Sequence, residues 1–185
     1  MTLKQGLGAV WWVLLFPLAF IAAMLTHSLV LLYYSHVMSA ILWTGTDIFM
    51  GLLLGPILQK LPVEARRPVL TSLFPKVFWV LPISAITTGT AGWFLAHRMG
   101  DIIPGHPWPL PIIFAAVIVT LLTVQGFGFL LPTNYKIYRM MQSGTPPTPE
   151  QAQLLKRRMA AYRIGVTIQA LAQFAIIIVM VILAA

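Results

Sequence analysis

Four histidines and one isolated aspartate are the residues of this sequence best suited to chemistry. Asp47 is the only charged residue in the long apolar stretch between residues 5 and 59. A carboxylate inside a membrane span is expensive and usually faces a bundle interior or water. Neutral imidazole is a ligand for haem iron and for copper. The histidines are His27, His36, His97 and His106.

The segment HVMSAILWTGTDIFMGLLLGP, residues 36–56, places several of these groups in register. His36, Trp43, Asp47 and Leu54 are spaced by seven, four and seven residues, so at 3.6 residues per turn they share one helical face. Ala40 lies on the same face, and a small residue there would let a flat ring lie against the helix. The pattern predicts a metal or cofactor surface; the alternatives are interfacial histidines bonded to headgroups and an aspartate bonded to nearby Thr or Trp.

The composition identifies an integral membrane protein. Of 185 residues, 59% are hydrophobic and only 9% are charged, and the mean hydropathy is +0.88. Soluble domains carry about 25% charged residues, so a sizeable soluble domain is excluded. The absence of cysteine removes disulfides and thiolate metal sites. The net charge of +8 indicates topology determinants and anionic lipid rather than nucleic acid.

The apolar stretches predict one all-α domain over residues 1–185, a polytopic membrane bundle of five helices. A bilayer core of about 30 Å needs about 20 residues per span. A polar loop is expected at 61–68, and Gly144 is expected to end the fourth helix. Thr148 and Gln151 have the spacing of a capping box for the fifth. The predicted helices are 8–27, 32–59, 72–97, 112–142 and 149–185.

The basic residues predict the orientation of this bundle. In the five-helix arrangement eleven of the twelve fall on one side, and only Arg98 falls on the other. The positive-inside rule makes that side cytoplasmic. The N-terminus is then inside and the C-terminus outside, in a bacterial-type inner membrane. All four histidines fall on the outer side.

Small and amide-bearing residues supply further cofactor features. Thr88 and Gly89 give the third helix a small, polar-lined surface. Gln125, Gln169 and Gln173 are intramembrane amides, and the last two are four residues apart on one face. They would line a quinone or porphyrin edge, or act as hydrogen-bonding groups between helices.

The pattern His36, Trp43, Gly45 and Pro56 resembles the first core helix of the copper-resistance protein D superfamily, which includes the bacterial membrane protoporphyrinogen oxidase. The resemblance implies a four-helix core formed by the second to fifth helices, with one N-terminal transmembrane helix added. It also implies a haem or porphyrin role for His36. The oxidase branch carries Leu-Pro-Arg near the end of this helix, where this chain has Pro56 and Ile57 without an arginine.

These observations lead to a membrane-embedded haem-binding protein of redox or electron-transfer function. The expected cofactor is haem b, with copper as the alternative, and the axial pair is His36 with His97; His27 and His106 are weaker choices. A quinone or a second redox protein would be the partner, and an enzyme of this kind would be an oxidoreductase. Two alternatives stay open: a copper or small-solute transport protein, and an accessory subunit of a larger complex or oligomer.

Overall fold

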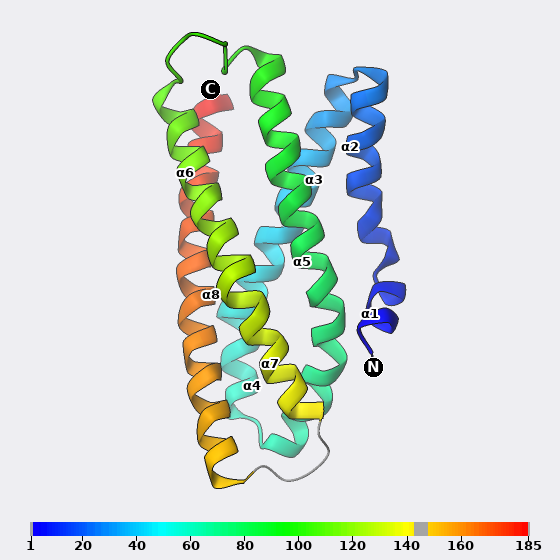
Figure 1. The fold of residues 1–185 in the computed structure, drawn as a ribbon, viewed down its shortest axis with the longest axis vertical. Coiled ribbons are helices and arrows are strands. Elements are labelled where there is room, and N and C mark those ends of the chain that lie inside the picture. The colour runs from blue at the N-terminus through cyan, green and yellow to red at the C-terminus, as the bar shows by residue number, and fades with distance from the viewer. Residues whose placement is uncertain (1, 143–147, 185) are drawn as a thin grey trace.

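The computed structural model describes residues 2–142 and 148–184 and is built from helices (Figure 1). Four stretches are long and apolar enough to cross a membrane, and a bent pair near the N-terminus makes a fifth if it is counted as one span. The expected all-α membrane bundle is therefore confirmed. The elements are α1 (Leu3–Ala9), η1 (Trp11–Leu14), α2 (Leu15–Thr26), α3 (Leu29–Ile48), η2 (Phe49–Leu54), α4 (Gly55–Lys60), α5 (Val63–Met99), α6 (Leu110–Gln125), η3 (Gly126–Leu130), α7 (Leu131–Gln142) and α8 (Pro149–Ala184).

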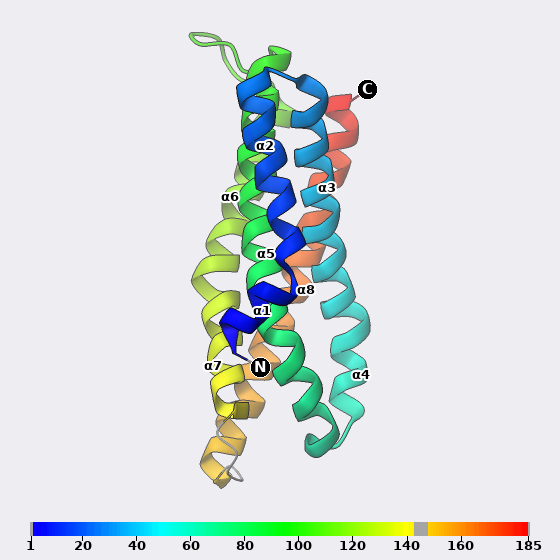
Figure 2. The same cartoon turned by 90° about the vertical axis from the view of Figure 1, so that its right-hand side faces the viewer.

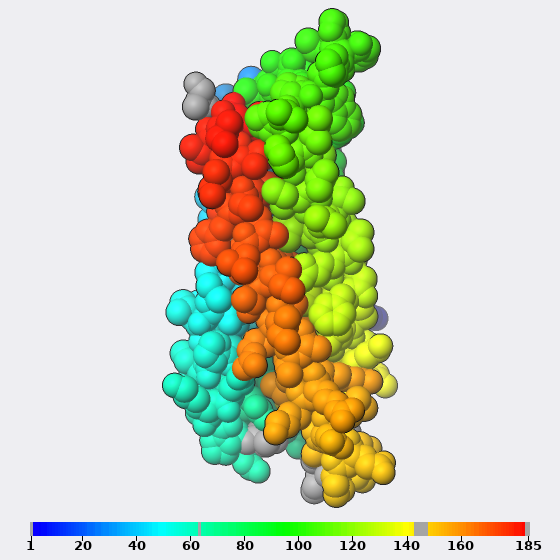
Figure 3. Space-filling view, turned by 90° about the vertical axis from the view of Figure 1, so that its left-hand side faces the viewer, coloured from blue at the N-terminus to red at the C-terminus, as the bar shows by residue number. Residues whose placement is uncertain are grey.

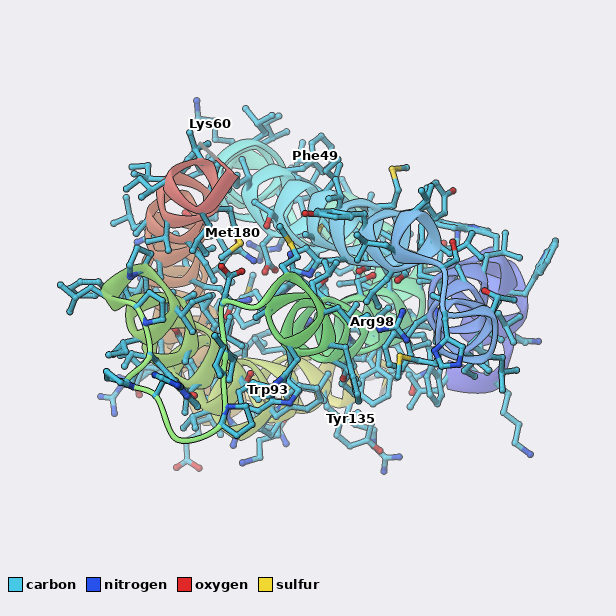
Figure 4. The ribbon with its side chains drawn as sticks, turned by 90° about the horizontal axis from the view of Figure 1, so that it is seen from above. Phe49, Lys60, Trp93, Arg98, Tyr135 and Met180 are labelled. Carbon is cyan, nitrogen blue, oxygen red and sulfur yellow. The ribbon has the colours of Figure 1, made fainter. Side chains whose placement is uncertain are left out.

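The long helix α5 lies at the centre of the bundle. Seen from above, α6 and α8 lie on one side of it, and α1 and α2 lie on the other (Figure 4). The segment α3–α4 packs against both α5 and α8, and α8 runs between this segment and α6–α7 on the surface (Figure 3). The helices α3 to α8 thus form a four-span core, and α2 packs on its edge against α3 and α5 (Figure 2).

The first predicted helix, 8–27, is wrong as one continuous element. A capping box between Thr2 and Gln5 begins a separate short helix, which ends at Val10, and the chain then bends by 71°. α1 is held against α5 because the Trp79 indole N–H donates to the carbonyl of Leu3 over 2.9 Å. Gly6 rests directly on the backbone of Pro75, where a side chain would have no room.

The second and third helices begin earlier than predicted. α3 starts at Leu29, because His27 adopts a left-handed conformation and Ser28 caps the helix by accepting from the Leu31 N–H. The predicted polar loop 61–68 is wrong over most of its length, since α5 begins at Val63. Charged side chains do not end a helix; Pro62 stands at the N-cap, and Pro68 is accommodated inside the helix.

Two spans contain π-helical segments, and each segment ends two residues before a proline. η2 runs into Gly55-Pro56, and η3 runs into Leu131-Pro132. A proline ring clashes with the carbonyl four residues earlier, and widening the turn relieves that clash. Gly126, Gly128 and the following Pro132 are thus the weak points of the span that contains η3.

The cap predicted for the last helix is confirmed. The backbone N–H of Thr148 donates to Gln151 Oε1 over 3.1 Å, and the N–H of Gln151 donates to Thr148 Oγ1 over 3.3 Å. Gly144, predicted to end the preceding helix, lies outside the described residues.

Candidate intramembrane binding site

Asp47 lies in the bundle interior, bonded to two amides of α8. Its side chain is 3% exposed. Gln169 Nε2 donates to Asp47 Oδ2 over 2.5 Å, and Gln173 Nε2 donates to the same oxygen over 2.9 Å. Trp43, one turn earlier on α3, lines the same cavity as the carboxylate. The two amides that share a helical face thus meet the one isolated acid of the sequence.

A cavity borders this group and touches all four core spans. The volume open to a water-sized sphere is about 50 Å³, which is room for a small ion or a few water molecules. Most of its wall is apolar, and its polar side chains converge from several helices. These are Asp47 and Trp43 of α3, Thr123 of α6, Asn134 of α7, and Tyr162 and Gln169 of α8.

The cavity lies at the middle of each span. The four candidate spans are 29–60, 64–99, 110–142 and 149–183. Trp43 and Asp47 bracket the middle of the first, and Pro82 is at the middle of the second. Gly126 is the central residue of the third, and Gln169 is near the centre of the fourth. In a membrane that these helices cross, this level is close to the bilayer midplane.

His36 is fixed between α3 and α5. Its Nδ1 is 2.9 Å from the carbonyl of Thr88, and its ring lies against Gly92. A Cβ added to Gly92 would approach His36 Cε1 to 2.7 Å, so only glycine leaves room for the ring. Below the ring, Thr88 Oγ1 bonds to Ser39 Oγ over 3.0 Å. His36 therefore belongs to a packed, hydrogen-bonded helix interface.

The other three histidines lie at the same end of the bundle, but the structure does not gather them around His36. His27 forms the turn before α3, His97 lies in the last turn of α5, and His106 lies in the exposed loop before α6. Within the described residues, no three of the His, Asp and Glu side chains are grouped so that they could hold a metal ion.

A haem held between His36 and His97 does not fit this arrangement. Nine residues separate Thr88, which contacts His36, from His97, and nine residues turn an α-helix by about 180°. His97 instead packs edge-on against Trp93, with ring centroids 4.9 Å apart. Trp93 lies on the side of α5 away from α3 (Figure 4). The cavity offers no substitute, because its wall includes neither histidine.

The remaining predicted cofactor residues have structural neighbours. Ala40 is half-buried on α3, and Gly89 of α5 faces Val119 of α6 at ordinary contact distance. Trp43 lines the cavity as described. Sequence reasoning missed Tyr162 and Asn134, which hydrogen-bond to each other at the cavity wall over 3.3 Å. The sequence gives little signal for either residue, since Tyr162 directly precedes Arg163 and Asn134 lies two residues before Lys136.

No family model, no curated protein and no solved structure matches this chain.

Proposed function

We propose that the chain is a membrane transport protein for a small polar solute, which binds at Asp47 in the midplane cavity. The observation that carries the proposal is a buried carboxylate on the wall of a cavity that all four core spans share. An ionisable side chain at this depth is costly, and membrane proteins keep such groups where a substrate or ion passes.

Helix irregularities at the level of the cavity support this proposal. η2 begins two residues after Asp47, and η3 contributes Gly126 to the wall. Pro82 of α5 also lines the cavity, and having no N–H it leaves the carbonyl of Phe78 without its usual helical donor. Solute sites of membrane transporters lie near the midplane beside interrupted helices, and π segments often mark functional sites.

A flux measurement tests the proposal. The purified chain is reconstituted into liposomes, and the uptake of a panel of small cations, amines and neutral polar solutes is followed against empty liposomes. We expect uptake of at least one solute, and at least a tenfold loss of that uptake in Asp47→Leu. Gln125→Leu is the matched control, because Gln125 joins α6 to the Gly165 carbonyl without lining the cavity. Equal uptake by Asp47→Leu and the natural chain would refute the proposal.

For the orientation we propose a cytoplasmic N-terminus in a bacterial-type inner membrane. The turn between α4 and α5, the last turn of α7 and the first turn of α8 lie at one end of the bundle (Figure 1). Lys60, Arg67, Arg139 and Arg158 belong to that end, and Arg98 belongs to the opposite end. Antiparallel helices thus bring these basic residues to one end of the bundle, and the positive-inside rule makes that end cytoplasmic.

A second candidate function is ligation of a metal centre, copper or haem iron, by His36 alone. It is favoured by the bond between Nδ1 and the Thr88 carbonyl, because metal-binding histidines commonly use one ring nitrogen in this way and coordinate through the other. A bound haem would supply redox chemistry, with a quinone or redox protein as partner. Purified protein with a Soret band that is lost in His36→Ala and kept in His97→Ala supports this candidate. Colourless, copper-free protein contradicts it.

A further inference from the structure

The amides around Asp47 leave two hydrogen-bond acceptors unused. Gln169 and Gln173 both direct Nε2 at the carboxylate, so their carbonyl oxygens point elsewhere. Among the residues that the structure describes, neither Oε1 atom has a hydrogen-bond partner, although both atoms are buried. The side chains themselves are 3% and 0% exposed. An unpaired buried acceptor costs about 1–3 kcal/mol, so a partner for these oxygens would be favourable.

One of these oxygens faces the cavity wall. Gln169 lines the cavity, and its Oε1 lies 3.9 Å from the position that a Cβ on Gly126 would occupy. Gly126 opens the π segment η3. The oxygen is thus directed toward the glycine side of α6–η3, where the wall carries little bulk.

The charge of the site selects the ligand. Asp47 is paired by amides, and within the described ranges it makes no ion pair with Lys, Arg or His. At its end of the cavity the Asp47 carboxylate and the Gln169 carbonyl oxygen are acceptors for a cation or for N–H donors. One carboxylate balances one positive charge, so a bound monovalent cation makes the site neutral. A neutral site is favoured because an uncompensated charge is costly in the low dielectric of the membrane interior.

We propose that Asp47, Gln169 and Gln173 form a binding site for a small monovalent cation, either an alkali ion or an ammonium group. The inference rests on the proposed function, in that it names the class of solute for the same cavity. The cation meets the Asp47 carboxylate and the carbonyl oxygen of Gln169. The Gln173 amide holds the carboxylate in place from one turn further along α8.

Thermal unfolding of the purified chain in detergent tests the site without transport. The probes are NaCl, KCl and NH₄Cl, each compared with choline chloride at equal ionic strength. We expect at least one of the three to raise the midpoint by about 5 °C or more at a hundredfold excess over its dissociation constant. Selective stabilisation by the alkali salts or by NH₄Cl distinguishes the two kinds of cation.

Two variants remove the ligands and one serves as control. Asp47→Asn removes the charge and keeps an acceptor for both amides, and Gln169→Leu removes the free oxygen. Both should lose the salt-specific shift, and Gln125→Leu should keep it. A shift equal to that in choline chloride means that water alone occupies the site, which overturns the proposal. An unchanged shift in Asp47→Asn also overturns it.

The outcome is separable from that of the proposed function. Cation binding without flux in liposomes would leave the site standing and refute transport. Flux of a neutral solute that depends on Asp47, without any salt-specific stabilisation, would keep transport and refute the cation site.

Discussion

Alanine substitutions at two glycines of α5 should have opposite effects on stability. An added Cβ at Gly92 meets His36 Cε1 at 2.7 Å and Nδ1 at 3.0 Å. An added Cβ at Gly89 meets only Val119 Cγ1, at 3.8 Å, which is ordinary contact. Both substitutions replace glycine by alanine within the same helix. The pair therefore isolates the contact with the histidine ring.

The magnitude follows from three contributions. Alanine is better than glycine in a helix interior by about 1 kcal/mol, so Gly89→Ala should be neutral or stabilising by up to that amount. Gly92→Ala has the same gain, but overpacking costs about 1–3 kcal/mol. Displacing the ring also breaks the bond between His36 and Thr88, worth about 1 kcal/mol. The net expectation for Gly92→Ala is a loss of about 1–3 kcal/mol in the free energy of unfolding.

Unfolding in mixed micelles of a mild and a denaturing detergent measures these differences, with helical circular dichroism as the signal. The control is Gly92→Ala in a His36→Ala background, where no ring meets the new methyl group. The cost of the Gly92 substitution should fall by more than half in that background. If Gly92→Ala and Gly89→Ala unfold alike, the ring does not lie against Gly92 and the described α3–α5 interface is wrong.

Three further predictions concern other parts of the chain. The free energy of unfolding of Asp47→Asn should lie within about 1 kcal/mol of that of the natural protein, because asparagine keeps an acceptor for both amides. Asp47→Leu should be about 2 kcal/mol less stable than Asp47→Asn, because two buried donors lose their partner. The same detergent titration measures both variants, and equal stability would contradict the hydrogen bonds from Gln169 and Gln173 to Asp47. Trp79→Phe removes the donor to the Leu3 carbonyl and should speed tryptic cleavage at Lys4, followed by mass spectrometry, without changing the unfolding of the bundle. A reporter fused after Ala185 should be active only on the outer side of the membrane, and cytoplasmic activity would refute the orientation.

The fold could be predicted from the sequence because a bilayer leaves few choices. Apolar length sets the number of spans, and the cap at Thr148 and the weak points before Pro132 are local signals. The break at Val10 could not be predicted, because it depends on α1 meeting α5 across more than seventy residues of chain. The start of α5 was misplaced because charge was taken as a loop signal, although helix ends tolerate charge in water.

The sequence predicted which residues belong to the candidate site, but not which of them contact one another. Asp47 was expected to face the interior, and its 3% exposure confirms this. Periodicity placed the two glutamines on one face, but nothing in the spacing showed that this face meets α3. Likewise, shared depth suggested that His36 and His97 are paired. The depth of a residue in the membrane does not determine where it lies around the helix axis, and His36 and His97 lie on different sides of α5.

The two π segments also determine where the chain can tolerate the insertion or deletion of a residue. η2 and η3 each carry a widened turn, so losing one residue there can restore a regular α-helix and leave both flanking halves in register. α8 is one regular helix of 36 residues. A single deletion between its cap and Gln169 would rotate the glutamine by about 100° and remove it from Asp47. Single-residue insertions and deletions should therefore accumulate in η2 and η3 and be purged from α8.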